Sequence, residues 1–208
     1  MSESRYRNLK SGKDEEEEDP VLVHSGTQPS KVNDGGGVDF LFNKYQVEMQ
    51  VLREDYVGVY EDKIEERKRS LSLNSMSHPD SGFDLFVTDD VTIPAGEIKV
   101  INMQVKCSVY GNMHGGTRVP LPYYLYARSS VIKRGIILAN SVGIIDCGYR
   151  GPLMTGFYNT RKEDVEIKAG ERVAQICMSD LWPYYNVSLT KSIDLTERNE
   201  GGIGSTGL

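Results

Sequence analysis

Residues 98–109 read IKVINMQVKCSV, directly after the turn signal Pro94-Ala95-Gly96, and are typical of a β-strand. Further segments of this kind follow along the chain, with glycine-containing turns between several of them. The predicted strands are 83–87, 98–109, 122–127, 136–139, 152–158, 164–167, 172–178 and 184–189. Many short strands at spacings of roughly 8–12 residues predict an all-β fold, either a sandwich or a barrel.

Two different patterns precede this region. Apolar side chains recur mostly at every second position in residues 38–51, which predicts a strand or two. In residues 57–71 the apolar side chains have helical spacing, at Val57, Tyr60, Ile64 and Leu71. Glu65 and Arg69 can form an i,i+4 pair on the same segment. The sequence therefore predicts one amphipathic helix, which is either an insertion that packs on the β-rich domain or a site for a partner.

The length of 208 residues suits one domain, and the two ends differ from its middle. Residues 1–37 include the acidic run 14–19 and predict a disordered extension, more readily a solvated spacer than a partner-binding tail. Residues 38–196 are the predicted β domain, and the glycine-rich residues 197–208 predict a flexible C-terminal arm.

Composition excludes several classes of function. The formal charge of −6 and the pI near 5.2 disfavour long nucleic acid as a partner, because that binding depends on clustered Lys and Arg. The three cysteines lie far apart without a CxxC pair, which implies neither a disulfide framework nor a zinc site. No signal-peptide pattern and no run of about 18 apolar residues occurs, so we expect an intracellular protein without membrane contact, in the cytoplasm or the nucleus.

The C-terminal arm contains the sequence GIGSTG (202–207), which matches the GxGxxG pattern of dinucleotide-binding folds. That motif requires a strand before it and a helix after it, and the sequence stops at Leu208, so we expect no Rossmann domain here. The glycine amides and hydroxyl groups can still wrap around phosphate oxygens, and Arg198 can add a charged fork.

Three other short segments carry side chains suited to chemistry. Asp146 follows two large apolar residues and precedes a turn, so its carboxylate either faces a pocket or fixes the turn. Arg128, Ser129 and Ser130 supply a cation and two hydroxyl groups that suit a phosphate. Gln175 lies among alternating apolar residues, which by itself favours a structural hydrogen-bonding group. None of these segments is specific by itself.

Their order along the chain is much more specific. It resembles the five ordered motifs of the trimeric deoxyuridine triphosphatases (dUTPases), over roughly residues 80–208 and the strand before them. The matching segments are SGFDL (81–85), ARSS (127–130), GIIDCGYRG (143–151), GERVAQ (170–175) and RNEGGIGSTG (198–207).

The resemblance implies a jelly-roll-like β-barrel, a homotrimer whose three subunits share each active site, and hydrolysis of dUTP to dUMP and pyrophosphate. Asp146 matches the carboxylate that orients and deprotonates the attacking water. Recognition of the base and the sugar is implied for Asn140, Gly143, Ile145, Tyr149 and Ile203. Phosphate binding is implied for Arg128, Ser129, Ser130, Gln175, Arg198, Gly204, Ser205 and Thr206. Mg²⁺ is the implied cofactor, with Asp84 near its water shell.

Three positions depart from the family pattern and leave two alternatives. Gly148 replaces an acidic residue, Ala127 replaces a proline, and Ile203 replaces an aromatic residue that covers the base. dCTP deaminases also have a glycine at the position of Gly148. Their general-base glutamate, however, would correspond to Gly156 here, and residues 150–162 contain no carboxylate. The second alternative is an inactive nucleotide-binding jelly-roll protein. It is disfavoured by the joint presence of Asp146, Tyr149, Arg128, Gln175 and Arg198.

Overall fold

The computed structural model describes residues 44–71, 78–113, 116–183, 185–199 and 201. Several expectations fall elsewhere: the acidic extension 1–37, the first part of the strand region 38–51, and the arm residues Ile203, Gly204, Ser205 and Thr206 lie outside the described residues. The described residues belong to one unit, Gly35–Leu208.

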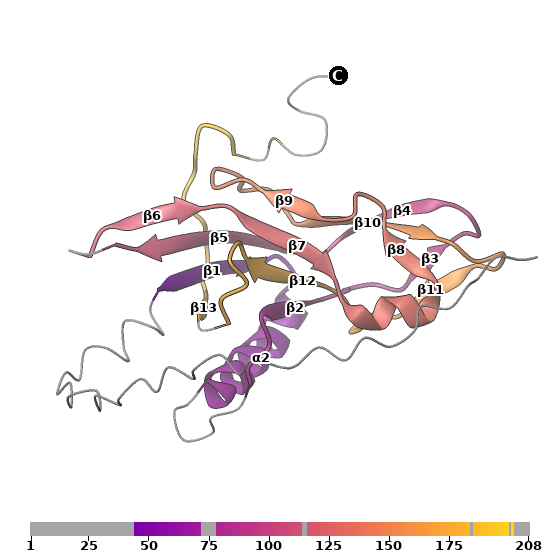
Figure 1. Ribbon diagram of the computed structural model, residues 1–208, viewed down its shortest axis with the longest axis horizontal. Coiled ribbons are helices and arrows are strands. Elements are labelled where there is room, and N and C mark those ends of the chain that lie inside the picture. The colour runs from indigo at the N-terminus through magenta and orange to yellow at the C-terminus, as the bar shows by residue number, and fades with distance from the viewer. Residues whose placement is uncertain (1–43, 72–77, 114–115, 184, 200, 202–208) are drawn as a thin grey trace, which may run out of the picture. The chain divides into compact units, whose positions relative to one another are not determined.

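Strands dominate the described chain, together with one α-helix and two 3₁₀-helices (Figure 1). The strands are β1 (Tyr45–Val51), β2 (Gly82–Phe86), β3 (Val91–Ile93), β4 (Ile98–Asn102), β5 (Val105–Asn112), β6 (Arg118–Leu121), β7 (Tyr123–Ala127), β8 (Ile136–Leu138), β9 (Gly143–Ile145), β10 (Met154–Asn159), β11 (Val165–Ile167), β12 (Arg172–Met178) and β13 (Tyr185–Leu189). The helices are η1 (Glu54–Tyr56), α2 (Val57–Ser70) and η2 (Ser129–Arg134). None of the helices in these segments is long and apolar enough to span a membrane.

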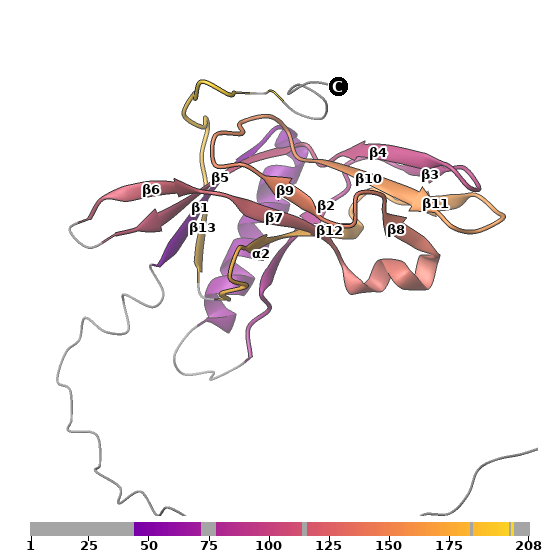
Figure 2. The ribbon, with the colours of Figure 1, turned by 45° about the horizontal axis from the view of Figure 1, so that its top comes forward.

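The strands form four sheets, with the orders β13-β1-β5-β6, β2-β12-β7-β9, β4-β10-β8 and β11-β3 (Figures 1 and 2). β1 pairs with β13 in parallel, and every other described pairing is antiparallel. The predicted β-rich class is therefore confirmed. The sheet β2-β12-β7-β9 carries residues of four of the five sequence motifs, because Asp84 lies on β2, Gln175 on β12, Ala127 at the end of β7 and Ile145 on β9.

The core consists of apolar side chains from most of the strands. In β1 the alternate residues Tyr45, Val47 and Met49 are buried, which confirms the described part of the predicted strand region. Side chains without exposed surface elsewhere include Phe83, Leu85, Ile93, Phe157 and Ile176. Burial of each large apolar side chain stabilises the fold by about 1.5–3 kcal/mol.

Helix α2 confirms the predicted amphipathic helix to within one residue of its end. Its buried side chains are Tyr60, Ile64 and Arg67, at the i, i+4, i+7 spacing of one helix face. The Tyr60 ring packs edge-on against Phe86 of β2 with ring centroids 5.2 Å apart, and its hydroxyl accepts the Phe86 amide at 3.1 Å. On the exposed face Glu65 forms an ion pair with Lys68. The helix thus packs on the β-rich domain, as the insertion interpretation expects.

The predicted strand 98–109 is wrong in one respect, because it is divided into β4 and β5. Gln104, between them, has a φ of 55°, and its amide donates a hydrogen bond to Asn102 Oδ1 at 2.8 Å. An Asn side chain that accepts from the amide two residues later forms an Asx turn. Asn102 was therefore the sequence signal for the break.

The sequence prediction also missed three strands, β3, β6 and β9. β3 and β9 contain three residues each, too few to show a period. β6 contains Pro120, and a proline within a strand pattern argues against a central strand. β6 is nevertheless formed because it lies at the edge of its sheet, where the missing amide costs no ladder hydrogen bond.

Candidate active site

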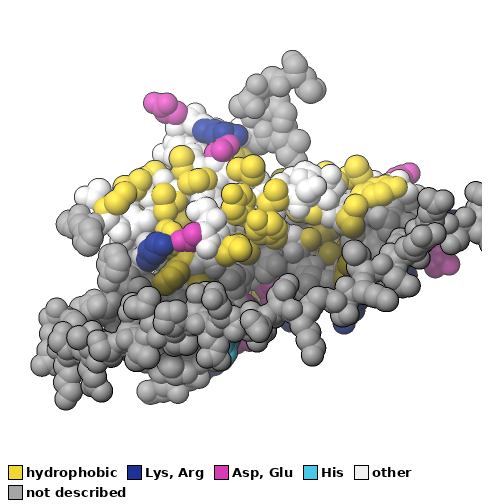
Figure 3. Space-filling model, in the orientation of Figure 1, with side chains coloured by type: hydrophobic (Ala, Val, Ile, Leu, Met, Phe, Trp, Pro, Cys, Tyr) yellow, Lys and Arg dark blue, Asp and Glu magenta, His cyan; other side chains and the backbone are white. Residues whose placement is uncertain are grey.

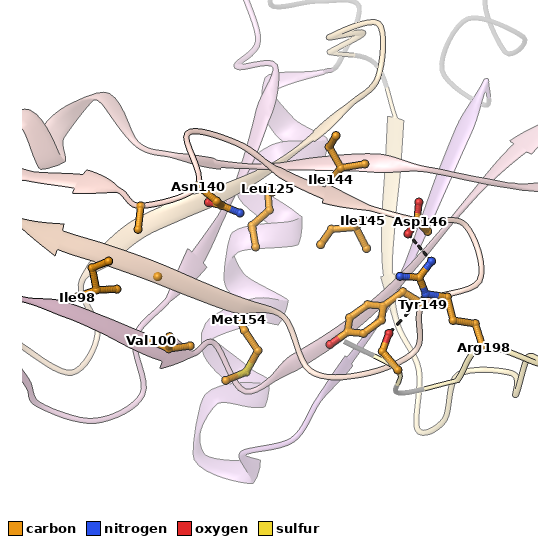
Figure 4. Close-up of a pocket in the computed structure, with 14 residues that line it drawn as sticks. Ile98, Val100, Leu125, Asn140, Ile144, Ile145, Asp146, Tyr149, Met154 and Arg198 are labelled. Atoms are coloured by element: carbon orange, nitrogen blue, oxygen red, sulfur yellow. Dashed lines mark hydrogen bonds and ion pairs between the residues drawn. The ribbon is translucent and has the colours of Figure 1, made fainter. Parts of the chain in front are cut away.

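A cavity of about 430 Å³ opens beside the hairpin that joins β8 to β9. Figure 4 shows the apolar side chains of Ile98, Val100 and Ile145 around it, with Asn140 from the hairpin. Its lining is mostly apolar with a few polar side chains, which is typical of a site for a small ligand with an apolar or aromatic part.

The hairpin is tight because its backbone takes a strained conformation and approaches β7 closely. Ser141 has a φ of 63°, and the Val142 amide donates to the Asn140 carbonyl at 2.6 Å. A Cβ at Gly143 would lie 3.0 Å from Leu125 Cβ and 3.3 Å from the Leu125 carbonyl oxygen. Glycine therefore lets β9 pair with β7 at this point and places the hairpin backbone at the cavity.

Asp146 comes directly after β9 and lines the same cavity. The turn that follows is closed by its backbone, because the Tyr149 amide donates to the Asp146 carbonyl at 3.0 Å. Its side chain is 49% exposed and forms an ion pair with Arg198, with 2.5 Å between Oδ2 and the guanidinium nitrogen (Figure 4). The turn thus holds the residue by its backbone, and the carboxylate faces the cavity edge.

Arg150 joins this turn to the chain segment 194–199. It is buried, its Nε donates to the Asp194 carbonyl at 3.0 Å, and its guanidinium also donates to the Cys147 carbonyl at 2.9 Å. The Arg150 amide donates to the Asn199 carbonyl at 2.7 Å. These bonds place Arg198 beside Asp146 of the same chain.

Tyr149 forms another wall of the cavity and is locked in place. Its hydroxyl donates to the Pro152 carbonyl at 2.8 Å. A Cβ on Gly151 would lie 2.5 Å from that hydroxyl oxygen, so the glycine two residues later makes room for the ring. A fixed ring at the edge of an apolar cavity can stack on a flat or ring-shaped part of a ligand.

A second cavity, of about 340 Å³, collects another group of the predicted residues: Asp84, Arg128, Ser129 and Gln175. The buried Asp84 carboxylate is held by Arg128 Nε at 2.7 Å and by an Arg172 guanidinium nitrogen at 3.0 Å. Arg128 caps η2, whose first two residues, Ser129 and Ser130, are exposed. Two cations and exposed hydroxyl groups suit a polyphosphate at this surface.

Gln175 is packed closely in this second cavity. Its Nε2 donates to the Ala127 carbonyl at 3.3 Å, and a Cβ on Gly82 would lie only 1.9 Å from its Oε1. Cys177 lines the same cavity, and burial raises the pKa of its thiol to about 11. The thiol therefore stays protonated near neutral pH and is not a nucleophile there.

The two cavities have no lining residue in common. The structure brings Asn140, Gly143, Ile145, Asp146 and Tyr149 together in the first. It places the predicted phosphate ligands Arg128, Ser129 and Gln175 in the second. Arg198, which was expected among the phosphate ligands, lies in the first cavity with Asp146.

Sequence reasoning missed Arg150 and Arg172. Arg150 directly follows Tyr149 and resembles an ordinary turn cation, and its burial is decided by the returning segment 194–199. Arg172 lies three residues before Gln175, and residues three apart point to opposite faces of a regular strand. A register shift between Arg172 and Ala174 changes that relation, and no sequence signal announced it.

The described residues do not fit a magnesium ion held by protein ligands. No group of three or more His, Cys, Asp or Glu side chains in these segments could hold a metal ion. Both oxygens of Asp84 already accept hydrogen bonds from arginine side chains. The contact of Asp84 through water with a hydrated metal stays a prediction.

The arrangement defines a binding site for a small molecule with a flat or apolar part and an anionic part. A family model described as dUTPase matches residues 69–207. The deoxyuridine 5'-triphosphate nucleotidohydrolase of Clostridium kluyveri is 37% identical over 131 residues, which cover 62% of this chain and 84% of that protein. The protein of the same name from Rickettsia akari is 36% identical over 155 residues, 70% of this chain and 94% of that protein.

The chain belongs to the dUTPase family. This assignment rests on the sequence matches. Among solved structures, the native EIAV dUTPase is 30% identical and superposes with a TM-score of 0.39, covering 47% of this chain and 73% of that chain. The dUTPase of Streptococcus mutans is 34% identical, with a TM-score of 0.38 and coverages of 47% and 75%.

Proposed function

We propose that this protein hydrolyses dUTP to dUMP and pyrophosphate, which lowers dUTP and supplies dUMP for thymidylate synthesis. The observation that carries the proposal is the position of Asp146, whose half-exposed carboxylate lies at the edge of an apolar cavity in a chain of the dUTPase family. A carboxylate in that position can accept a proton from a water molecule without a metal of its own.

The base and the deoxyribose would occupy the first cavity. Asn140 and the backbone of Gly143 and Ile145 would read the edge of the uracil, because hydrogen-bonding groups fixed in the hairpin reject a base with mismatched donors and acceptors. Tyr149 would stack on the sugar and leave no room for a 2′-hydroxyl, and its fixed hydroxyl supports that role. Ile203 would cover the base as part of the arm.

The reaction is an in-line displacement at the α-phosphorus. Asp146 would accept a proton from the attacking water, the new bond would form between the water oxygen and phosphorus, and pyrophosphate would leave with the electrons of the broken P–O bond. Opening of the ion pair between Asp146 and Arg198 would free Oδ2 as well as Oδ1 of the carboxylate for this step. Arg198 would then move to the triphosphate with Gly204, Ser205 and Thr206 of the arm.

The second cavity would bind the triphosphate of a neighbouring subunit's nucleotide, through Arg128, Ser129, Ser130 and Gln175. The proposal of shared sites is supported by the separation of the two cavities, since Asp146 and Arg128 of one chain line different cavities. Magnesium would arrive with the triphosphate and keep most of its water ligands.

A homotrimer would cover an apolar face that this chain leaves exposed. On the sheet β4-β10-β8, Tyr158 lies opposite both Ile98 and Ile137, and Val100 is close by on β4. Ile98 is 59% exposed and Ile137 51% exposed. Figure 3 shows hydrophobic side chains gathered on the face of the molecule that carries these strands. We propose that the sheets close into a jelly-roll-like barrel and associate through such surfaces.

The alternative of a dCTP deaminase is disfavoured at Gly156. A Cβ there would meet Ala139, Ile98 and Val100, all of them apolar. Asp146 supplies the one carboxylate in the described lining of the first cavity. Deamination would need a second general base near the ring of the nucleobase, and the described lining of the first cavity contains no other carboxylate.

The proposed function is tested by pyrophosphate release from dUTP in the presence of magnesium, with dCTP, dTTP and UTP as comparison substrates. We expect release from dUTP and strong discrimination against the other three, because the hairpin and the Tyr149 ring are built for uracil and deoxyribose. Ammonia from dCTP would favour the deaminase, and nucleotide binding without any product would favour the inactive binding protein.

Gly82→Ala is expected to weaken binding of the triphosphate without unfolding the protein. A Cβ at residue 82 would overlap Gln175 Oε1, so the flexible end of Gln175 must leave its place in the second cavity. We expect KM for dUTP to rise about tenfold, which corresponds to the loss of about 1.4 kcal/mol of binding. Gly58→Ala on α2, where a Cβ meets nothing within 4 Å, is the matched control and should leave KM unchanged. An unchanged KM in Gly82→Ala would remove Gln175 from phosphate binding.

A further inference from the structure

Arg67, in the last turn of α2, is a buried cation that the chemistry described above does not use. Its residue surface is 8% exposed, and it lies two positions before the region that matches the dUTPase family model. No ion pair of Arg67 with a carboxylate occurs among the described residues. Burial lowers the pKa of its guanidinium group. A buried charge without an opposite charge is costly, so its hydrogen bonds have to be specific.

The guanidinium group joins two segments that are far apart in sequence. One nitrogen donates to the Pro183 carbonyl at 2.7 Å. The second terminal nitrogen donates to the carbonyls of Asp80 and Gly82, at 3.4 and 3.3 Å, and the buried Nε has no hydrogen-bond partner among the described residues. The Tyr185 ring lies against the guanidinium group, with 3.9 Å between the guanidinium carbon and the ring centroid. An apolar side chain of the same size would fill this space but could make none of these three hydrogen bonds.

Tyr185 holds the same segment from β13. Its hydroxyl donates to the Ser81 carbonyl at 3.2 Å, between the two carbonyls that Arg67 contacts on that segment. The side chain is fully buried, so this hydroxyl has no water to exchange with. Arg67 and Tyr185 together therefore engage the carbonyls of three consecutive residues, Asp80, Ser81 and Gly82.

These three residues form one wall of the second cavity, where the triphosphate is proposed to bind. Gly82 packs against the end of Gln175, and Asp84 follows two residues later and holds Arg128. A shift of the 80–82 backbone would therefore move Gln175 and the pair of Asp84 with Arg128. Phosphate binding depends on such groups being held within a fraction of an ångström of their working positions.

We propose that Arg67 is a positioning residue for the triphosphate surface, and that together with Tyr185 it fixes the backbone of residues 80–82. The helix insertion α2 thus supports the second cavity as well as covering the core. The inference rests on the proposed function, and it assigns to a residue of the helical insertion an effect on phosphate affinity. Arg67 itself touches no substrate and acts through Gly82, Gln175 and Asp84.

The test compares Arg67→Met with Ile64→Ala, one turn earlier on the buried face of the same helix. Both variants are expected to lower Tm, because each removes buried contacts. Arg67→Met is expected to raise KM for dUTP about tenfold and to leave kcat near the wild-type value, since hydrogen bonds to a charged group hold the wall in place. Ile64→Ala is expected to keep the wild-type KM. Equal KM values in the two variants would overturn the proposal.

Two inhibitors separate the two cavities. We expect Arg67→Met to weaken inhibition by inorganic pyrophosphate and to leave inhibition by deoxyuridine unchanged. Of these two inhibitors, only pyrophosphate is proposed to bind in the second cavity. If inhibition by both compounds weakens to the same degree, the substitution has loosened the fold in general, which would contradict a positioning role. Wild-type protein that releases no pyrophosphate from dUTP would refute the proposed function itself, which is a different outcome from a wild-type-like KM in Arg67→Met.

Tyr185→Phe provides a second test that does not depend on how well Arg67→Met folds. The substitution removes one hydroxyl and keeps the ring against Arg67, so the core volume is preserved. We expect a rise of KM by a few-fold with kcat unchanged, in the same direction as Arg67→Met. Arg67→Lys keeps the positive charge but loses the forked guanidinium group. If both Tyr185→Phe and Arg67→Lys have the wild-type KM, phosphate binding does not depend on the hydrogen bonds of Arg67 and Tyr185 to residues 80–82, and the proposal is refuted.

Discussion

Asp146→Asn is expected to lower kcat for dUTP hydrolysis by about a hundred- to ten-thousandfold, the usual contribution of a general base. Asparagine keeps the size of the side chain and can still accept a hydrogen bond from Arg198, but it cannot take up the proton of the attacking water. Binding of dUTP should therefore remain close to that of the wild type. Single-turnover kinetics and calorimetric titration with dUTP measure the two effects separately.

Asp164→Asn is the matched control for this substitution. Asp164 is an exposed carboxylate that accepts the Ala95 amide at 3.0 Å, in a turn that lines neither cavity. The same chemical change there should leave both kcat and binding unchanged. Turnover by Asp146→Asn at a rate near that of the wild type would remove Asp146 from the catalytic role. Loss of dUTP binding in that variant would assign the carboxylate to recognition instead.

A mixture of two inactive variants is expected to regain activity if the sites are shared between subunits. Asp146→Asn damages the first cavity, and Arg128→Met damages the second, with Arg172 left to hold Asp84. In randomly mixed oligomers each site draws one cavity from each of two chains, so about a quarter of the sites combine two intact cavities. Co-refolded samples should therefore reach about a quarter of the wild-type kcat, whereas each variant alone stays inactive.

The control for this experiment is the double variant, Asp146→Asn with Arg128→Met, mixed with each single variant. Every site then contains at least one damaged cavity, and no activity should return. These control mixtures should stay inactive whether or not the subunits assemble completely. Sedimentation or size-exclusion chromatography of each mixed sample measures the degree of assembly. Mixtures of the single variants that assemble but stay inactive would place both cavities' functions within one chain and contradict shared sites.

Much of the fold could be predicted because its signals are local. The period of the apolar side chains predicts β1 in the described part of residues 38–51, and it predicts α2 with Tyr60 and Ile64 on its buried face. The break between β4 and β5 was also encoded locally, in Asn102, but the apolar character of the whole stretch concealed it. β6 could not be predicted, because the tolerance for Pro120 depends on its place at a sheet edge.

The candidate site divides in the same way. The motif order pointed to some of the residues that line each cavity, and Asn140, Asp146 and Tyr149 do lie together in the first. The contact of Arg198 with Asp146 could not be predicted, since it depends on Arg150 binding the returning segment 194–199. Arg172 was missed because a register shift re-aims its side chain toward Asp84.

The sequence by itself determined a β-rich domain with one helix and a family. Strand periodicity and turn residues are properties of neighbouring residues, and the order of the motifs can be read along the chain without knowing its fold. It also predicted the strand 83–87 and the turn at Pro94-Ala95-Gly96, both of which precede residues 98–109. The tertiary structure alone decided that this stretch is two strands, that predicted site residues lie in two separate cavities, and that Arg67 of the helix donates hydrogen bonds to Asp80 and Gly82 in the lining of the second. Those outcomes depend on contacts between residues far apart in the chain, whose geometry is fixed only when the sheets and the helix pack together.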